Sequence, residues 1–230
     1  VAVHSLKDLP TIPIAELLLA AVPPRGPTGD VLVSRRHASF AALPQRATVA
    51  TSSLRRRAQI LHRRPDLRLV PIRGNVETRL RKLTDEGLDA LVLAQAGLER
   101  LGLAEAMVEI LDSAWMLPAV GQGALGLECR AGDMAALHLL QHIDDPQTRP
   151  AVLAEREFLR CLGGGCQVPI GALGCRIEQG LTLRGVVLDP EGRHRVHGEV
   201  TGTVPDAEAL GRQLAEQLLG QGAKGLLQRA

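Results

Sequence analysis

The sequence predicts a mixed α/β protein with a separate C-terminal α+β domain. Apolar runs of strand length alternate with helical patterns up to about residue 145. Two segments that carry Pro and Gly, 23–30 and 117–123, interrupt this alternation and are expected to be crossings between structural units. Beyond residue 145 a helix is followed by a run of strand candidates, which is typical of a separate α+β domain.

The elements of the alternating part can be placed in chain order. The expected strands are 1–3, 31–33, 48–50, 67–72, 88–93 and 124–129, with a further short apolar run at 17–22. The expected helices are 54–62, 76–86 and 133–142. Ser53 is a good N-cap for the first helix, and Gly87 ends the second. Alternation of this kind predicts βα units and a largely parallel sheet.

The C-terminal part follows a different pattern. A helix is expected over 148–162, and a closing helix over 206–219. Between them lie three strand candidates, 170–176, 181–188 and 194–202. Because no helix separates these strands, they are expected to form a small sheet of their own.

Composition excludes several classes of protein. Of the 230 residues, 45% are hydrophobic, so the chain can bury a core. Lys and Arg number 27 against 25 Asp and Glu, a net charge of +2 that argues against binding nucleic acid by bulk charge. No apolar run approaches the ~20 residues that span a membrane. The four cysteines form no CxxC pair and have no His at zinc-ligand spacing, which indicates reduced thiols and no metal.

Two predicted βα junctions present arginines. In the first, Ser53 is followed by Arg55 and Arg56 at the start of a helix, where free N–H groups and the helix dipole favour an anion. The second, residues 73–79, repeats the arrangement. An arginine in a first helical turn is often merely solvated, but two such junctions in consecutive units favour a polyanionic ligand.

A third junction, His4-Ser5-Leu6-Lys7-Asp8, places a carboxylate beside an ammonium group. Asp8 in a cleft lined by arginines would stay ionised and could hydrogen-bond an N–H or stabilise a developing cation. An ordinary helix-capping aspartate is the alternative, and spacing by itself favours it.

The segment Gly163-Gly164-Gly165-Cys166 has an unusual composition. A cysteine on a glycine-rich arm suggests an exposed nucleophile or an attachment point rather than a core residue. The Lys and Ser or Thr of a phosphate-binding loop do not follow the glycines.

Taken together, these segments resemble the porphobilinogen deaminase family, also called hydroxymethylbilane synthase. The matching segments, in family order, are HSLKDLP (4–10), TSSLRRRAQ (51–59), RGNVETRLRKL (73–83), LAQAGLERLG (93–102), LPAVGQGALGLECR (117–130) and GGGCQVPIGA (163–172). The family's N-terminal segment, which precedes HSLKDLP, is not seen here, and the chain by itself is expected to need it for activity.

The resemblance implies two lobes like those of periplasmic binding proteins and a small α+β domain that carries the cysteine. The first lobe, N-terminally incomplete, is expected to comprise 1–25 and 120–144. The second lobe is expected over 26–119, and the C-terminal domain over 145–230. The two crossings inferred from composition fit the connections between the lobes.

The resemblance also implies a reaction. A dipyrromethane cofactor is joined to Cys166 by a thioether, and four porphobilinogen molecules are added to it head to tail with loss of ammonia. Hydrolysis then releases hydroxymethylbilane for tetrapyrrole biosynthesis. Asp8 matches the catalytic aspartate, which holds pyrrole N–H groups and stabilises a cationic azafulvene. The residues that match cofactor or substrate contacts are Ser5, Lys7, Ser53, Arg55, Arg56, Arg73, Gly74, Asn75 and Arg79. A cytoplasmic monomer without nucleic-acid or membrane partners is expected.

Two other functions remain open at this point. A binding protein of the same two-lobed fold would explain the arginines but not the glycine arm. A transferase that uses Cys166 as a transient nucleophile would need a nearby base, and no His lies in that segment.

Overall fold

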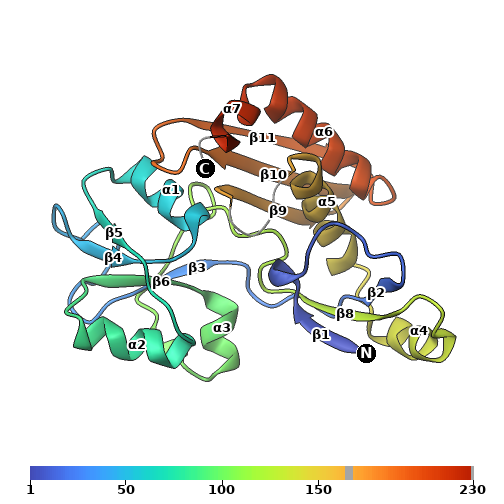
Figure 1. Cartoon of the computed structure of the whole chain (residues 1–230), viewed down its shortest axis with the longest axis horizontal. Helices are drawn as coiled ribbons and strands as arrows, with labels where there is room; N and C mark the ends of the chain where they lie inside the picture. The colour runs from blue at the N-terminus through green and yellow to red at the C-terminus, as the bar shows by residue number, and fades with distance from the viewer. Residues whose placement is uncertain (164–167, 229–230) are drawn as a thin grey trace.

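Three β-sheets organise the chain (Figure 1). The computed structural model describes residues 1–163 and 168–228. The first sheet is antiparallel and contains, in spatial order, β1 (Ala2–Ser5), β8 (Leu125–Arg130) and β2 (Leu17–Ala21). Its central strand comes from far along the sequence, so this sheet is complete only after the chain has passed through the second sheet and returned.

The second sheet has five strands. Their spatial order is β5 (Arg68–Val70), β4 (Thr48–Ala50), β6 (Ala90–Ala94), β3 (Asp30–Val33) and β7 (Glu109–Ile110). Three helices belong to this unit: α1 (Leu54–Arg63), α2 (Val76–Asp85) and α3 (Gln95–Arg100). A short 3-10 turn, η2 (Ala104–Ala106), precedes β7. Apolar residues of β3, β4 and β6 are fully buried and form its core.

The expectation of a largely parallel sheet is wrong. In the described part of the chain, the parallel pairings are those of β4 with β5 and with β6. β3 pairs antiparallel with both β6 and β7, and the first sheet is antiparallel throughout. β3 enters its sheet directly from the crossing 23–30, so no helical crossover precedes it to make it parallel to its neighbours.

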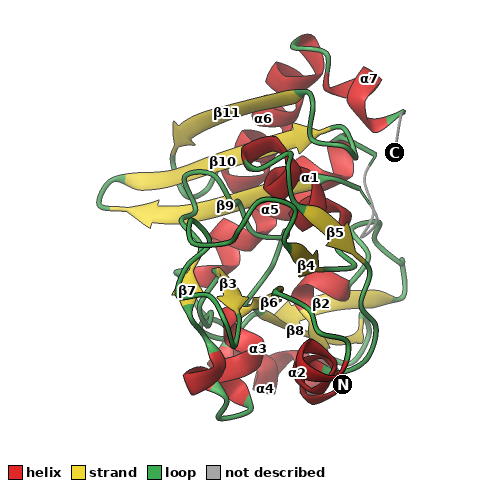
Figure 2. Cartoon of the chain, turned by 90° about the vertical axis from the view of Figure 1, so that its left-hand side faces the viewer, coloured by secondary structure: helices red, strands yellow, loops and turns green. Residues whose placement is uncertain are grey.

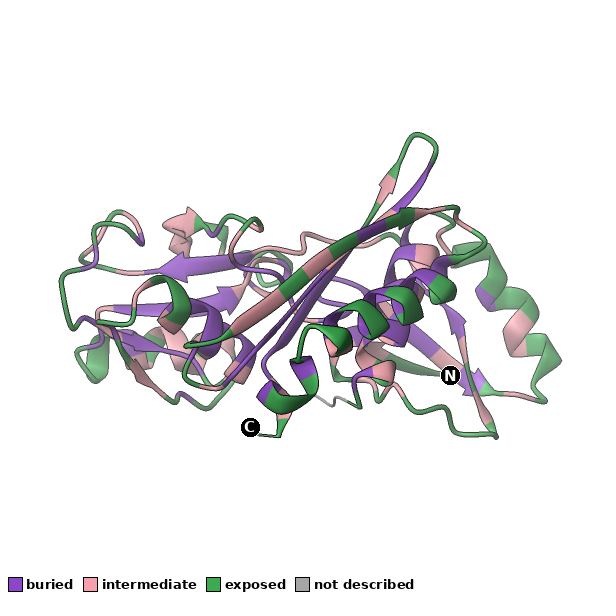
Figure 3. Cartoon of the chain, turned by 90° about the horizontal axis from the view of Figure 1, so that it is seen from above, coloured by how far each residue is buried: buried purple, intermediate pink, exposed green. Residues whose placement is uncertain are grey.

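The third sheet is an antiparallel meander. It consists of β9 (Ile170–Ile177), β10 (Gly180–Leu188) and β11 (Arg195–Gly202). The long helices α5 (Thr148–Cys161) and α6 (Ala207–Gly220) pack on it, and α7 (Ala223–Leu227) follows (Figure 2). Phe158, Leu183 and Leu214 are fully buried between sheet and helices. Figure 3 shows buried segments in purple along the strands and helices of the chain. The predicted class, mixed α/β with a C-terminal α+β unit, is confirmed.

Local signals explain where the helices begin. Ser53 caps α1 by accepting a hydrogen bond from Arg56 N at 3.3 Å, as its position predicts. Asn75 caps α2 and Asp133 caps α4 (Met134–Leu140) in the same way. A 3-10 turn, η3 (Gln141–Ile143), extends α4. Sequence analysis does not anticipate α3, α7 or β7, because they are short and carry no capping or periodic signal.

A single carboxylate connects the three sheets. Glu155 of α5 is fully buried, and Arg25 Nη1 and Nη2 donate to its two oxygens at 2.6 and 3.0 Å. Gly121 N donates to Oε2 at 2.7 Å, and Gly174 N donates to Oε1 at 2.8 Å. Arg25 lies in the first crossing, Gly121 in the second and Gly174 in β9. Glu155 therefore fixes both crossings against the C-terminal sheet.

Glu155→Gln is expected to destabilise the protein by about 3–5 kcal/mol, because it leaves the Arg25 guanidinium buried without its counter-ion. Urea unfolding would measure this loss. Glu86→Gln is the matched control, since Glu86 is exposed and lies 3.8 Å from Lys82. The control should change the free energy of unfolding by less than about 1 kcal/mol. Equal effects of the two substitutions would contradict the role given to Glu155.

Candidate active site

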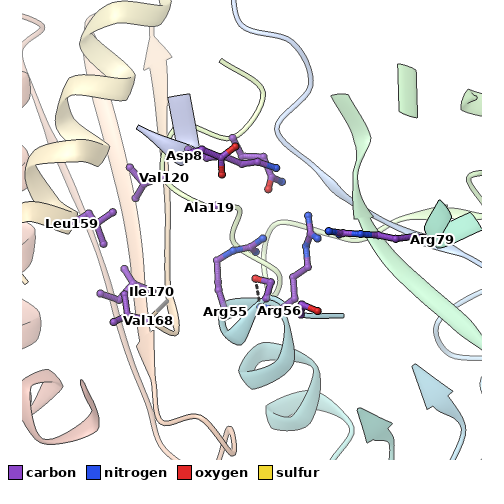
Figure 4. Close-up of a pocket in the computed structure, with 13 residues that line it drawn as sticks. Asp8, Arg55, Arg56, Arg79, Ala119, Val120, Leu159, Val168 and Ile170 are labelled. Atoms are coloured by element: carbon purple, nitrogen blue, oxygen red, sulfur yellow. Dashed lines mark hydrogen bonds between the residues drawn. The ribbon is translucent and has the colours of Figure 1, made fainter. Parts of the chain in front are cut away.

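A cavity of about 260 Å³ lies where the three units meet (Figure 4). It is open to solvent on one side and has three kinds of wall. The first wall is cationic and comes from α1 and α2, the second is apolar and comes from the C-terminal unit, and the third contains Lys7 and Asp8 from the turn after β1. Polar, charged and apolar groups thus converge on one space from segments far apart in the sequence.

The cationic wall begins at the first turn of α1. Arg55 and Arg56 follow the N-cap Ser53 directly after β4, and both side chains are buried. Figure 4 shows them extending from the start of α1 toward the cavity. The position after a strand of an α/β sheet is where ligands bind in such folds, and the helix dipole adds to the positive charge there.

Asp30, at the start of β3, holds both arginines in place. Arg55 Nη1 lies 2.7 Å from Asp30 Oδ2, while Arg56 Nε and Nη2 lie 2.9 and 2.7 Å from Oδ1. Asp30 is fully buried. Burial by itself would raise the pKa of this carboxyl, but the charges and hydrogen bonds of Arg55 and Arg56 outweigh it and hold the pKa well below its usual range. Two guanidiniums share one carboxylate, so the cluster keeps a net positive charge.

Gln122 of the second crossing completes this cluster. Its Nε2 donates to Asp30 Oδ1 at 2.9 Å and to the carbonyl of Thr28 at 2.7 Å. The side chain is buried and lines the cavity. The sequence patterns do not single out Asp30 or Gln122 as residues of this site. Asp30 could have been found from its position, because it is a lone aspartate at the start of an apolar strand, just after a Pro- and Gly-rich crossing.

The second arginine junction brings Arg79 into the cavity. Arg79 Nε donates to the carbonyl of Gly74 at 2.8 Å, which fixes the direction of the side chain. Gly74 has φ +121°, and a Cβ there would lie 2.6 Å from Thr78 Cγ2, so only glycine fits. Burial and the nearby charge of Arg56 lower the pKa of Arg79.

The third wall is the short turn η1 (Leu6–Asp8) that follows β1. Leu6 is buried against Gly121 and Gly126, and its N–H donates to Ala124 O at 3.0 Å, so the turn is held against the second crossing and β8. Asp8 is exposed and Lys7 half-buried, and both line the cavity. Burial, and then the charge of Arg56, lower the pKa of Lys7.

The apolar wall faces the arginines. Val120, Leu159, Val168 and Ile170 lie on one side of the cavity in Figure 4, and the last three belong to the C-terminal unit. Arg156 of α5 also reaches across, donating to the carbonyls of Leu9 and Pro10 at 3.0 and 2.6 Å. Arg156 therefore clamps the chain just after Asp8 instead of standing in solvent.

The structure brings together most of the predicted site. The predicted residues that line the cavity are Lys7, Asp8, Ser53, Arg55, Arg56 and Arg79. Ser5, Arg73, Gly74 and Asn75 stand outside the lining, where Gly74 and Asn75 shape the start of α2. Cys166 lies outside the described residues. Ser52, which hydrogen-bonds Ile72 O at 2.6 Å, is a lining residue that the sequence did not single out.

The donor set of the cavity fits a ligand with several carboxylates. Lys7, Arg55, Arg56 and Arg79 line one cavity, and the buried carboxylate of Asp30 pairs with Arg55 and Arg56. Arg55 Nε has no hydrogen-bond partner among the described residues. The pKa values of Lys7 and Arg79 are lowered partly by the charge of Arg56, so an anion in the cavity would relieve this repulsion. Within residues 1–163 and 168–228, no cluster of His, Cys, Asp and Glu could hold a metal, and no helix is long and apolar enough to cross a membrane.

Fold and site define a protein of several α/β units with a cavity between them whose cationic lining fits a multiply charged anion and also contains a carboxylate. Comparison with known families identifies the family of this chain. The family described as "Porphobilinogen deaminase, dipyromethane cofactor binding domain" matches residues 1–138, and "Porphobilinogen deaminase, C-terminal domain" matches residues 150–220. The chain belongs to the porphobilinogen deaminase family, as its motifs predict.

Two porphobilinogen deaminases with similar sequences agree with this assignment. The porphobilinogen deaminase of Syntrophotalea carbinolica is 52% identical over 226 residues, which cover 98% of this chain and 72% of that protein. The porphobilinogen deaminase of Pelotomaculum thermopropionicum is 52% identical over 229 residues, which cover 100% of this chain and 73% of that protein. Among solved structures, a substrate binding protein of a polar amino acid uptake transporter from Streptococcus thermophilus aligns with a TM-score of 0.31 and 16% identity, covering 61% of this chain and 51% of that one.

Asp30→Asn is expected to destabilise the fold by about 3–5 kcal/mol at neutral pH, because two buried guanidiniums lose their carboxylate. In the folded state the pKa of Asp30 lies well below the ordinary 3.8, so the unfolded chain takes up this proton first as the pH falls. The stabilisation is therefore complete above about pH 4 and is lost as the pH falls through the folded-state pKa. Urea unfolding at a series of acidic pH values should show a shallower loss of stability in Asp30→Asn.

Asp85→Asn is the control for this series. Asp85 lies on the exposed side of α2, 3.9 Å from Arg81, and its replacement should change stability by no more than about 0.5 kcal/mol. If Asp30→Asn lost stability with acid as steeply as the parent protein, the buried cluster would not depend on this carboxylate.

Proposed function

We propose that this chain catalyses the porphobilinogen deaminase reaction in the cavity between its three units. In this reaction four porphobilinogen molecules are joined head to tail, each with loss of ammonia, and hydroxymethylbilane is formed for tetrapyrrole biosynthesis. The observation that carries the proposal is the convergence of Asp8 with Lys7, Arg55, Arg56 and Arg79 on one cavity, in a chain of this family.

The dipyrromethane cofactor of the family fits this donor set. Each pyrrole of such a ligand carries two carboxylates, and guanidinium groups bind carboxylates through two parallel hydrogen bonds. Arg79 is oriented by the Gly74 carbonyl and Arg55 and Arg56 by Asp30, so these donors are fixed before a ligand arrives. When bound, the cofactor supplies the primer on which the chain of pyrroles is built. We assign its thioether attachment to Cys166.

Asp8 is the proposed catalytic residue. It is an exposed carboxylate on the rim of a cationic cavity, held on the turn that Leu6 anchors and Arg156 clamps from the other side. A carboxylate there accepts hydrogen bonds from pyrrole N–H groups and stabilises the positive charge that develops as ammonia leaves. Lys7 and the arginines neutralise substrate carboxylates, so the negative charge of Asp8 stays available to the reacting carbon.

The remaining assigned residues have supporting roles in this proposal. Ser53 offers its hydroxyl at the start of α1. Gly74 and Asn75 set the start of α2 and thereby the direction of Arg79. Ser5 directly precedes η1 and Arg73 lies just before α2, and we propose that they contact the cofactor or the growing chain.

The domain division is also a proposal. We assign 1–25 and 120–144 to a first lobe, 26–119 to a second and 145–230 to a C-terminal domain. The three sheets support it, since each sheet is built from strands of one of these parts. We further propose a cytoplasmic monomer without a nucleic-acid partner. The net charge of +2 and the free thiols of Cys129, Cys161 and Cys175 support this.

Intact mass of the protein purified without denaturation tests the function. The parent protein should carry extra mass equal to two deaminated porphobilinogen units, and Cys166→Ser should lose it. Cys175→Ser, which removes an exposed free thiol, should keep it. Extra mass in Cys166→Ser would overturn the attachment, and a parent protein that carries none and forms no hydroxymethylbilane would favour a binding protein without turnover.

Asp8→Asn should lower kcat by roughly 10²–10³-fold, the usual effect of removing one preorganised electrostatic group, while cofactor loading measured by mass persists. Asp85→Asn serves as the control for loss of a surface carboxylate and should keep the parent rate. Full activity of Asp8→Asn would remove Asp8 from the catalytic role.

A further inference from the structure

A second cationic cavity lies at the opposite end of α1, between this helix and the β10–β11 hairpin. It measures about 560 Å³, and its lining includes His62, Arg193, His194 and Arg195. A neighbouring hollow of about 310 Å³ shares His62 and Arg195 and adds Arg63 and Trp115. Figure 1 shows the hairpin loop reaching from the C-terminal unit to α1.

Among the described residues, no carboxylate pairs with Arg193 or Arg195 or lines either cavity. Of the described residues that line the two cavities, none is Asp or Glu. Arg193 and Arg195 form no ion pair within residues 1–163 and 168–228, and Arg63 lies 4.9 Å above the ring of Trp115 instead. Burial lowers the pKa of Arg195, as expected for a cation withdrawn from water without a partner.

The hairpin turn that carries these side chains has a fixed backbone. The buried Asp189 accepts hydrogen bonds from the backbone N–H groups of Glu191, Arg193 and His194 at 3.0, 3.2 and 2.6 Å. The carboxylate of Asp189 is thus already engaged with the backbone. Gly192 packs directly on α1, where a Cβ would lie 2.3 Å from Ala58 O.

His62 also contacts this hairpin turn. His62 Nδ1 lies 2.8 Å from the carbonyl of Gly192, so the imidazole is oriented by the same turn that carries the arginines. Two guanidiniums on a turn with a fixed backbone, and an imidazole held by the same turn, line a cavity of ligand size and suit an anion.

We propose that this cavity binds a small multivalent oxyanion, of the phosphate or carboxylate class, between Arg193, Arg195 and His62. Forked guanidinium groups match the oxygens of both classes. The site is separate from the catalytic cavity, because α1 has 10 residues and its ends are about 15 Å apart. A ligand here touches both the second sheet's unit and the C-terminal unit, and so holds them together.

Calorimetric titration of the full chain with inorganic pyrophosphate, and separately with citrate, tests the proposal at constant ionic strength. The parent protein should bind at least one of them, and the tighter probe identifies the class. The double variant Arg193→Gln/Arg195→Gln should weaken this binding at least tenfold. Arg81→Gln, which removes a charge from the exposed side of α2, should bind as the parent does.

The catalytic cavity is the other cationic site that could take these probes. Arg79→Gln distinguishes the two, since it should leave the second site intact. The proposal is overturned if neither probe binds, if the double variant binds as tightly as the parent, or if Arg79→Gln alone abolishes binding. If the double variant fails to fold, hydrogen exchange of the parent protein with and without each probe tests the proposal instead. Pyrophosphate or citrate must slow exchange of backbone amides in 192–196 more than in 52–56, and the reverse overturns the proposal.

Discussion

The arrangement of this protein depends on the buried carboxylate of Glu155. Its two oxygens accept two hydrogen bonds from the guanidinium of Arg25 and one each from the backbone N–H groups of Gly121 and Gly174, so its four hydrogen bonds join three different segments. A buried charge is tolerated only when it is paired and fully hydrogen-bonded, which makes this geometry restrictive. The same junction sets the distance between the apolar wall of the C-terminal unit and the arginines across the cavity.

A second buried carboxylate determines the electrostatics of the site. Asp30 orients Arg55 and Arg56 but neutralises only one of the two charges, and Lys7 and Arg79 add to the excess. The cavity is therefore rigid and positive before any ligand binds, as preorganised electrostatic catalysis requires. Asp8, exposed on the turn above it, is then the one carboxylate among the described lining residues, and its charge acts on the ligand rather than on the protein.

Sequence patterns anticipate the helices and strands well where the local signal is strong. The N-cap Ser53 lies within the segment predicted to cap α1, and β4, α1 and the three C-terminal strands are close to their expected bounds. The direction of β3 is not anticipated, because strand direction depends on the connection and on pairing with β6, neither of which is local. The contacts of Arg156 are not anticipated either, since helical periodicity cannot show that the Leu9 and Pro10 carbonyls approach it.

The sequence by itself determined the family, the residue types at the three junctions and the order of elements, because these depend on composition and short-range spacing. Only the tertiary structure decided that Asp30 and Gln122 belong with Arg55 and Arg56, that Glu155 joins the crossings, and that cations of α1 and the hairpin share a second cavity. Each of these contacts joins residues far apart in the chain. Attraction between opposite charges becomes strong only where the folded protein excludes water, so these contacts depend on the complete fold.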